Sequence, residues 1–450
     1  MSQTRRTFLN YLAAGTTMTI ATGAATRAFA QAAPRVLVVG GGTGGCTAAK
    51  YLKLENPDLQ VIVIEPFDQI YRCWGSNEVL TGHLDMAGIT ITHDALRRNY
   101  GIEFIYARVV GNDPAAKTVT LESGDTVGYD RMIVSPGIGF IMDTVEGYDQ
   151  EAADGPIPHG WKAGEQTRRL KAQIDAMPGN GLMVIAPPPN PYRCPPGPYE
   201  RASLLTEYFT HEKPNAKIMI LDIKNGFTKD QPFMLGWNRL YGFNIPIEKM
   251  SGMPADVRQH DVSGRLEWVS ADNGGQVVAM DPGAMTVTSS SGETIKADVI
   301  NYIPPQRAAD LAFTMDLTDG NWCPIIAETM ESARHPFIHV IGDATIAGAM
   351  PKSGYSANTQ AKIAAAQVNR LLTGQDLIEP TWSNVCFSRV SNEYGVSIGD
   401  QYRLDRANNA IIKTEGAGGV SPLDATHAIN RMEAFYQASW MANFAADCFE

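Results

Sequence analysis

The sequence predicts an α/β protein with two domains built on parallel sheets and a small C-terminal domain. A chain of 450 residues is longer than one hydrophobic core usually organises. Short, mainly apolar runs are typical of strands buried on both faces of a sheet, and they occur at residues 36–39, 61–64, 181–186, 299–302 and 337–341. Scattered aromatic residues replace this pattern near the end of the chain. We therefore expect the domains to comprise residues 31–150 with 301–376, residues 151–300, and residues 377–450.

The first strand leads into a glycine turn and a helix expected over about 44–54, and the next strand ends at Glu65. The turn has the spacing Gly40-x-Gly42-x-x-Gly45. Gly40 makes the tight turn, and Gly42 lets the backbone approach a pyrophosphate at the helix N-terminus. Glu65 is placed to hold a ribose hydroxyl. This combination of strand, turn, helix, strand and acid predicts a dinucleotide site, whereas the glycines alone would be weak evidence.

Two later segments indicate which dinucleotide is bound. The strand FIHVIGDA ends in Gly-Asp at Asp343, and YDRMIVSPG ends at Pro136 and Gly137. In this order the motifs resemble flavoproteins of the glutathione reductase type, which contain two Rossmann-like domains. The resemblance implies that FAD is the cofactor and that Asp343 binds its ribityl chain. Taken alone, Asp343 would be read as a turn or helix-capping aspartate.

The second Rossmann-like domain lacks the expected nicotinamide motif. The turn after the strand at 181–186 reads PPPNPYRCPPGP, in which seven of the twelve residues are proline. Proline has no backbone N–H to offer a pyrophosphate and does not adopt positive φ. We therefore expect that this domain does not bind NAD(P)H.

The same turn contains a candidate reactive cysteine. Prolines flank Cys194, a helix is expected from about Pro198, and the helix dipole would favour a thiolate. Glu200, six residues further on, is a candidate proton acceptor. A buried, inert thiol is an equally good reading of Cys194 from these local features.

Four long segments together resemble one family: YRCWGSNEV, APPPNPYRCPPGPYERAS, NYIPPQRA and GDATIAGAMPKSGYSANTQAK. They are similar to the flavoprotein subunit of flavocytochrome c sulfide dehydrogenase, a relative of the sulfide:quinone oxidoreductases. The similarity extends from Arg35 almost to the C-terminus. It implies an enzyme that oxidises sulfide and passes electrons to a c-type cytochrome on a separate chain, since C-x-x-C-H is absent here.

The resemblance also implies roles for individual residues. Cys73 matches the cysteine that attaches FAD covalently, and the alternative is a packed thiol beside Trp74. Cys194 matches one half of a redox-active disulfide, and Glu200 matches a proton acceptor. Lys352, Ser353 and Gly354 precede a helix pattern over 357–372, whose N-terminus would point at the flavin pyrimidine ring. A solvated lysine is the alternative for Lys352.

The chain departs from the family at one position. The partner cysteine of the family follows Gly-Asp-Ala, where this chain has Thr345, and threonine cannot form a disulfide. No other cysteine is an obvious substitute, although Cys46 lies in the flavin domain. A route that uses Cys194 alone stays open, with its thiolate adding to the flavin or carrying a persulfide. Two further alternatives stay open: an enzyme of the same fold with a substrate other than sulfide, and a flavin-containing electron carrier without substrate chemistry.

The N-terminus and the composition indicate the cellular setting. Residues 1–30 contain Arg5-Arg6, a weakly apolar stretch and an A-x-A site, which predict a twin-arginine export signal; an amphipathic helix is the alternative. We expect a periplasmic protein without a membrane span. A formal net charge of -11 argues against nucleic acid as a partner and permits a basic protein. Six cysteines without C-x-x-C spacing predict neither a metal site nor a disulfide scaffold.

Overall fold

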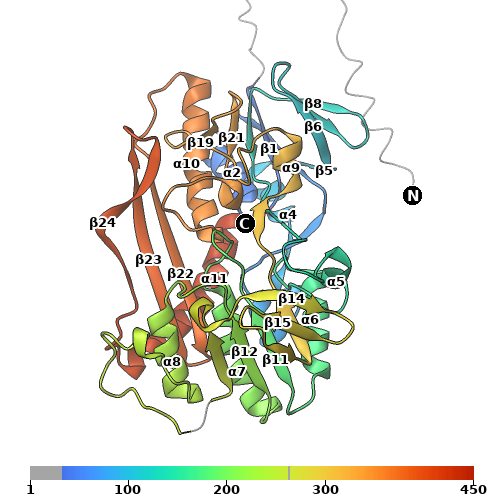
Figure 1. Cartoon of the computed structure of the whole chain (residues 1–450). Coiled ribbons are helices and arrows are strands. Elements are labelled where there is room, and N and C mark those ends of the chain that lie inside the picture. Colours follow the sequence, from blue (N-terminus) through green and yellow to red (C-terminus); the bar gives the residue numbers. More distant parts are fainter. Residues whose placement is uncertain (1–32, 262–263) are drawn as a thin grey trace, which may run out of the picture. The chain divides into compact units, whose positions relative to one another are not determined.

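The computed structural model describes residues 33–261 and 264–450, so the predicted export signal in residues 1–30 lies outside the described residues (Figure 1). Residues 34–450 form one unit that contains two largely parallel sheets and an antiparallel C-terminal sheet. The predicted α/β class is thereby confirmed. No helix in the described part of the chain is both long and apolar enough to cross a membrane.

The first sheet joins strands from both ends of the flavin-binding sequence. Its order is β19 (Ile325–Ile326), β20 (Glu331–Ser332), β21 (Ile338–Val340), β9 (Arg131–Val134), β1 (Arg35–Val39), β2 (Gln60–Glu65) and β5 (Glu103–Tyr106). The strands from β21 to β5 are parallel. Helices α2 (Thr43–Glu55) and α10 (Gly354–Thr373) pack against each other in this core. Burial on both faces explains why β1 and β2 are unbroken apolar runs.

The second sheet is fully parallel and forms the other Rossmann-like core. Its order is β13 (Leu266–Val269), β12 (Lys217–Leu221), β11 (Leu182–Ala186) and β17 (Val299–Tyr302). Three helices accompany it: α6 (Glu165–Ala176), α7 (Gly197–Glu212) and α8 (Asp230–Tyr241). The proline-rich turn therefore connects β11 to α7, in the place that a glycine turn occupies between β1 and α2.

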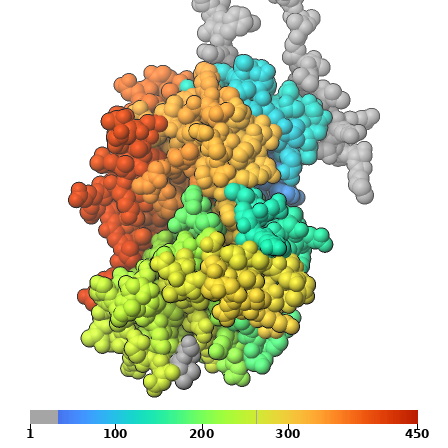
Figure 2. All heavy atoms as spheres, viewed as in Figure 1, coloured from blue at the N-terminus to red at the C-terminus, as the bar shows by residue number. Residues whose placement is uncertain are grey.

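The C-terminal part forms a three-stranded antiparallel sheet and a long helix. These are β22 (Thr381–Ser391), β23 (Tyr394–Asp405), β24 (Ala410–Val420) and α11 (His427–Phe449). In Figure 2 this red segment borders both the orange and the green parts of the chain. Its aromatic residues divide between the core and the surface: Trp382 and Tyr402 are each 1% exposed, whereas Phe435 is 56% exposed.

The remaining elements are short and connect these three sheets. They are β3 (Gln69–Tyr71), β4 (Thr90–Thr92), β6 (Val109–Asp113), β7 (Thr118–Leu121), β8 (Thr126–Gly128), β10 (Ile138–Phe140), β14 (Val277–Asp281), β15 (Thr286–Ser289), β16 (Thr294–Lys296), β18 (Gln306–Ala308), α3 (Ser76–Leu80), α4 (Asp94–Tyr100), α5 (Gln150–Asp154), α9 (Asp310–Thr314), and the 3-10 turns η1 (Ala87–Ile89), η2 (Ile247–Lys249), η3 (Ala271–Asn273) and η4 (Gly342–Ala344). The loop between β3 and α3 contains Cys73.

Candidate functional site

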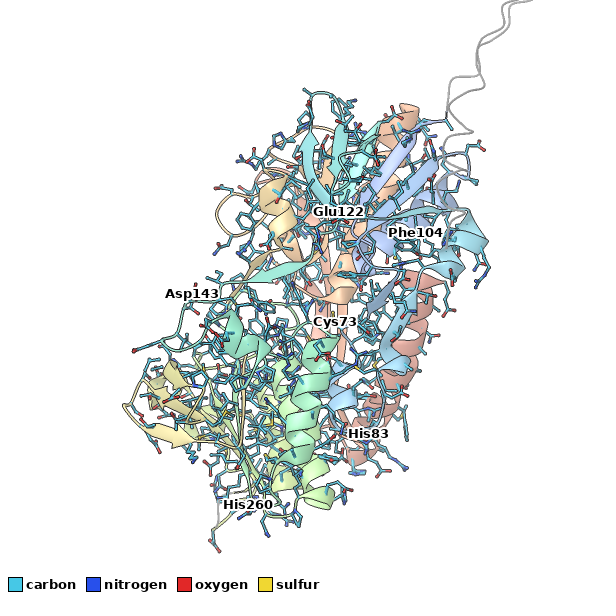
Figure 3. The ribbon with its side chains drawn as sticks, turned by 90° about the vertical axis from the view of Figure 1, so that its right-hand side faces the viewer. Cys73, His83, Phe104, Glu122, Asp143 and His260 are labelled. Atoms are coloured by element: carbon cyan, nitrogen blue, oxygen red, sulfur yellow. The ribbon has the colours of Figure 1, made fainter. Side chains whose placement is uncertain are left out.

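A cavity of about 560 Å³ lies where the two Rossmann-like cores and the C-terminal segment meet. Its lining includes most of the residues predicted from sequence: Gly40, Gly42, Glu65, Cys73, Pro136, Gly137, Cys194, Glu200, Asp343, Ser353 and Gly354. Figure 3 shows Cys73 between the segment that carries Phe104 and Glu122 and the segment that carries His260. The structure thus gathers residues from distant parts of the sequence around one space of the size that cofactors occupy.

The glycine turn is shaped by close backbone packing. Gly40 has φ +103°, which a residue with a side chain rarely adopts. A Cβ added to Gly45 would lie 1.7 Å from the Gly40 carbonyl oxygen, so Gly45 allows α2 to approach the turn but does not line the cavity. A Cβ on Gly42 would meet no protein atom within 4 Å, which leaves this position open toward the cavity.

The carboxylate of Glu65 belongs to the same turn. Its Oε2 accepts a hydrogen bond of 2.7 Å from the backbone N–H of Gly41, and its Oε1 accepts one of 3.3 Å from Phe67. Burial raises the pKa of Glu65, and the two backbone donors lower it. Glu65 therefore holds the turn and also faces the cavity, as the ribose-binding role requires.

Asp343 and the N-terminus of α10 also line the cavity. Ser353 caps the helix by accepting a hydrogen bond of 3.0 Å from the Ser356 N–H, and it donates one of 2.6 Å to Asn384. Burial raises the pKa of Asp343. Its Oδ1 is buried without a hydrogen-bond partner.

Other polar atoms that line the cavity also lack protein partners. They are Arg72 Nη1, Trp74 Nε1, Gln437 Oε1 and Trp440 Nε1, together with Asp343 Oδ1. A buried polar group without a partner costs about 1–3 kcal/mol, so such a cluster points to a polar molecule that supplies the missing hydrogen bonds. With the glycine turn and Glu65, these residues fit FAD: a pyrophosphate at α2 and ribityl hydroxyls at Asp343.

Helix α11 covers the cavity with apolar side chains, and the family resemblance of the sequence implies a C-terminal domain of residues 377–450 that closes over the flavin. Trp440, Met441 and Phe444 line the cavity, and the rings of Trp74 and Phe444 lie 4.6 Å apart. Helical periodicity places these side chains on one face, yet it does not reveal which surface that face covers. This packing excludes water from the cavity wall next to Cys73.

Cys194 is held in an unusual conformation at the end of the proline-rich turn. Its φ is +57°, which is uncommon for a residue other than glycine. Its N–H donates to the Lys352 carbonyl at 2.7 Å, and its carbonyl accepts from Gly197 at 2.8 Å. Burial raises the pKa of the Cys194 thiol, and the neighbouring Cys386 and Glu200 raise it further. The thiolate expected before α7 is therefore not favoured, because burial outweighs the helix dipole.

Glu200 lies in the first turn of α7 and faces the same cavity. Burial raises its pKa to about 7, against the opposing effects of the Arg389 N–H and Lys229. Its Oε1 accepts a hydrogen bond of 2.9 Å from the Arg389 N–H on β22. A carboxylate that titrates near neutrality is well suited to exchange protons at physiological pH.

Lys352 occupies a position that differs from the sequence expectation. Its ammonium donates to the carbonyls of Asp343 (2.7 Å) and Thr345 (2.9 Å) and lies 3.6 Å from the Trp322 ring centroid. It does not line the cavity, and burial lowers its pKa to about 8. Lys352 instead binds the Cys194 segment through its main chain, so its role toward a flavin stays a prediction.

Three family models match successive parts of the chain. Residues 34–170 match the pyridine nucleotide-disulphide oxidoreductase model. Residues 167–304 match the central domain of the sulfide dehydrogenase (flavocytochrome c) flavoprotein chain, and residues 378–449 match the flavin-binding domain of flavocytochrome c sulphide dehydrogenase. The matches follow the three sheets described above and support FAD as the cofactor.

Related proteins agree with these matches. A mitochondrial sulfide:quinone oxidoreductase from Mus musculus is 23% identical over 320 residues, which covers 69% of this chain and 65% of that protein. A sulfide-quinone reductase from Aquifex aeolicus is 26% identical over 152 residues, which covers 33% of this chain and 35% of that protein. The chain thus spans less than two thirds of either relative. The solved sulfide:quinone oxidoreductase from Aquifex aeolicus superposes with a TM-score of 0.66 at 18% identity, over 92% of this chain and 91% of that chain, which shows the common fold.

A shorter relative is more similar in sequence. The flavoprotein chain of sulfide dehydrogenase (flavocytochrome c) from Chlorobaculum thiosulfatiphilum is 47% identical over 45 residues, which are 10% of this chain and 94% of that sequence. Two of the three matching family models are models of flavocytochrome c sulfide dehydrogenase. The chain therefore belongs to the family of the flavoprotein chain of flavocytochrome c sulfide dehydrogenase.

Proposed function

We propose that this protein is a periplasmic FAD-dependent oxidoreductase that oxidises sulfide, or a related reduced sulfur compound, and passes the electrons to a c-type cytochrome. The observation that carries the proposal is that Cys194 and Glu200 face the same cavity as the residues that fit FAD. A sulfur nucleophile, a proton acceptor and an electron acceptor are the three components that oxidation of a thiol or sulfide requires.

The described residues divide the work of this reaction. When bound, FAD would supply a two-electron acceptor that can release electrons singly. Cys194 is presented rigidly by the proline-rich turn and the Lys352 carbonyl, so it would hold the substrate sulfur at one place. Glu200 would take the proton that the sulfur species releases. The apolar side chains of α11 would keep water away from the reacting sulfur.

Cys73 is the proposed attachment point for the flavin. It lines the cavity from the loop between β3 and α3, and Gly75 beside it has φ +93°. To test this role, the wild type and Cys73→Ser would be precipitated with acid and their pellets examined for flavin fluorescence. We expect flavin in the wild-type pellet and free flavin in the variant supernatant; flavin that leaves both pellets would show noncovalent binding.

The acceptor and the location are proposed from the family name and the sequence. A c-type cytochrome is the natural acceptor for the flavoprotein chain of a flavocytochrome, and the acidic chain suits a basic partner. Fractionation of cells that produce the full chain would test periplasmic export. Replacement of Arg5 and Arg6 with lysine is expected to keep the protein in the cytoplasm.

An anaerobic sulfide titration of the mature protein tests the central proposal. Flavin absorbance would be followed in the wild type, in Cys194→Ser and in Cys323→Ser, whose thiol lies outside the cavity. We expect rapid bleaching in the wild type and in Cys323→Ser, and at least a hundredfold slower bleaching in Cys194→Ser. Flavin that dithionite reduces but sulfide does not would exclude sulfide as the substrate.

A second candidate function keeps the fold and the cofactor but changes the substrate. Thr345 favours it, because the threonine removes the cysteine that the family resemblance implies at this place. In that case low-molecular-weight thiols would bleach the flavin faster than sulfide in the same titration. A pure electron carrier would respond to neither and would accept electrons only from a reduced protein donor.

A further inference from the structure

The side chain of Thr345 does not reach the cavity. It is 2% exposed, and its hydroxyl donates to the Gly342 carbonyl at 2.8 Å. Cys323 lies opposite Thr345 in a parallel β-bridge and is fully buried; its N–H donates to the Ala344 carbonyl and its carbonyl accepts from the Ile346 N–H. Neither residue lines the cavity. Any second protein sulfur that acts together with Cys194 therefore comes from another element.

Among the six cysteines, only three line the cavity: Cys73, Cys194 and Cys386. Cys46 and Cys448 are buried elsewhere, where Cys46 donates to the Gly41 carbonyl at 2.9 Å and Cys448 contacts Asn358. Cys73 is assigned to the flavin. Cys386 on β22 is the thiol that remains.

Strand β22 is fastened to the Cys194 segment on the N-terminal side of Cys386. Asn384, two residues earlier, accepts a hydrogen bond of 2.6 Å from Ser353. The residue before Ser353 is Lys352, whose carbonyl accepts the Cys194 N–H at 2.7 Å. This chain of two short hydrogen bonds ties the backbone of Cys194 to the start of β22.

The strand is fastened again on the C-terminal side of Cys386. The N–H of Arg389, three residues later, donates to Glu200 at 2.9 Å. Glu200 belongs to the helix turn that Cys194 precedes, in which the Gly197 N–H donates to the Cys194 carbonyl. Cys386 thus lies between two attachment points to the segment that carries Cys194, and both thiols face the same cavity.

A buried lysine accompanies Cys386. The ammonium of Lys229, which is 5% exposed, lies 3.7 Å from Cys386 Sγ and donates to the Cys386 carbonyl at 3.2 Å and to Ser388 at 2.9 Å. No carboxylate in the described chain lies within salt-bridge distance of this ammonium. A positive charge is therefore available where a sulfur that leaves a disulfide carries a negative charge.

We propose that Cys386 is the redox partner of Cys194, and that the two form a reversible disulfide which takes the place of the pair lost at Thr345. The pairing of Cys194 with Cys386 depends only on the protein, whereas the identity of the species that opens this disulfide rests on the function proposed above.

The opening step is a thiol–disulfide exchange with sulfide. Hydrosulfide, HS⁻, attacks Cys194 Sγ, a new S–S bond forms, and the Cys194–Cys386 bond breaks. Cys194 becomes a persulfide, and Cys386 leaves as a thiolate beside Lys229. The sulfide sulfur loses the two electrons that the disulfide gains.

The closing step regenerates the disulfide. A second HS⁻ removes the outer sulfur of the persulfide as HSS⁻ and leaves the Cys194 thiol. The thiol of Cys194 and the thiolate of Cys386 would then form the disulfide and release one proton to Glu200 and two electrons, for which FAD would be the acceptor. Atoms and charges balance with sulfide as reductant and a flavin as two-electron acceptor.

Peptide mapping of the holoprotein tests the pairing without measuring activity. The flavin-loaded protein would be oxidised with ferricyanide, alkylated under denaturing conditions and digested with trypsin without reduction. Cleavage places Cys194 in the peptide 194–201 and Cys386 in the peptide 371–389, each with a single cysteine. We expect a disulfide-linked pair of these peptides in the wild type and in Cys323→Ser, and none in Cys386→Ser or Cys194→Ser.

The result that overturns the pairing is a fully alkylated Cys386 in oxidised wild-type protein. This outcome does not depend on sulfide, so it is distinct from failure of the proposed substrate. Treatment with sulfide forms the second arm: the linked pair should disappear, and peptide 194–201 should gain one sulfur. If dithiothreitol opens the bond and sulfide does not, the pair stands and sulfide is excluded as substrate.

Kinetics of Cys386→Ser complete the test. We expect this variant to bind flavin as the wild type does and to lose at least tenfold in the rate of flavin reduction by sulfide. Cys323→Ser, the matched control beside Thr345, should keep the wild-type rate. The role of Cys386 would be refuted if sulfide reduced the flavin of Cys386→Ser at the wild-type rate and Cys194 gained as much sulfur as in the wild type.

Discussion

The turns after β1 and β11 occupy the same place in two similar cores, yet they differ in what they present. The first leads through Gly40 to a helix whose N-cap is Gly42, and it exposes backbone to the cavity. The second leads through prolines to a helix whose N-cap is Pro196, with another proline in its first turn. The first turn suits a pyrophosphate, whereas the second offers few N–H groups and presents side chains instead.

Under the proposed function, one topology serves two purposes. Parallel strands followed by helices bring both turns to the cavity, and turn composition then decides between ligand binding and chemistry. Cys194, with its positive φ, and Glu200 are the side chains that the second turn and its helix bring to the cavity. Variants in each turn should therefore have separable effects.

The largest effect is expected from Gly45→Ala. The added Cβ would overlap the Gly40 carbonyl oxygen at 1.7 Å, so α2 must move away from the turn. Overpacking of this kind costs about 3 kcal/mol in the free energy of unfolding and should also prevent FAD binding. Thermal unfolding and the ratio of flavin to protein would measure both losses; a stable, fully loaded variant would contradict the tight packing of the first turn.

A smaller and more selective effect is expected from Gly42→Ala. Its Cβ meets no protein atom, so the fold should survive, but it would occupy space next to the pyrophosphate. In a Cys73→Ser background, where the flavin should be exchangeable, we expect FAD to bind about tenfold more weakly, which corresponds to about 1.4 kcal/mol. Unchanged affinity would show that the pyrophosphate lies elsewhere. Gly179→Ala, outside the cavity, is the control.

Glu200→Gln should slow flavin reduction without loss of flavin. The carboxylate accepts a proton only above its pKa of about 7, which is raised chiefly by burial. Lys229 and Arg389 lower this pKa, and Glu78 raises it. The ratio of wild-type to variant rate should therefore approach one at pH 5.5 and rise to about a hundredfold at pH 8.5. This ratio cancels the titration of sulfide itself. A ratio independent of pH would exclude Glu200 as proton acceptor.

The stability of Glu200→Gln checks the same pKa independently. The folded protein retains a proton that the unfolded chain releases between pH 4.5 and about 7. The wild type therefore loses stability as pH rises through this window, and the glutamine variant should lose less. Denaturant unfolding at pH 5 and pH 8 would compare the two proteins; equal slopes would contradict the raised pKa.

The smallest change is expected with NADH, which should not reduce the flavin. Seven prolines in the second turn remove the N–H groups that a nicotinamide dinucleotide requires. Anaerobic NADH should leave flavin absorbance unchanged, whereas dithionite should bleach it. Reduction by NADH within minutes would show that the second core retains a dinucleotide site despite its prolines.

Much of the fold and part of the site could be predicted from local sequence. The expected strands at 61–64 and 181–186 and the helix over 44–54 agree closely with β2, β11 and α2, because buried apolar runs and glycine turns act over a few residues. Lys352 shows the limit of such prediction. Its motif predicts a role beside the flavin, but local sequence does not indicate that its ammonium donates to the carbonyls of Asp343 and Thr345.

The sequence by itself determined the strands, the composition of both turns, and hence which core suits a dinucleotide, since these properties depend on neighbouring residues. Only the tertiary structure decided which cysteines share a cavity. No local signal in NVCFS marks Cys386. Its place beside the segment of Cys194 arises because β22 packs against α7 and because hydrogen bonds join distant parts of the chain. Burial, which raises the pKa of Cys194 and Glu200, likewise exists only once the three sheets have packed.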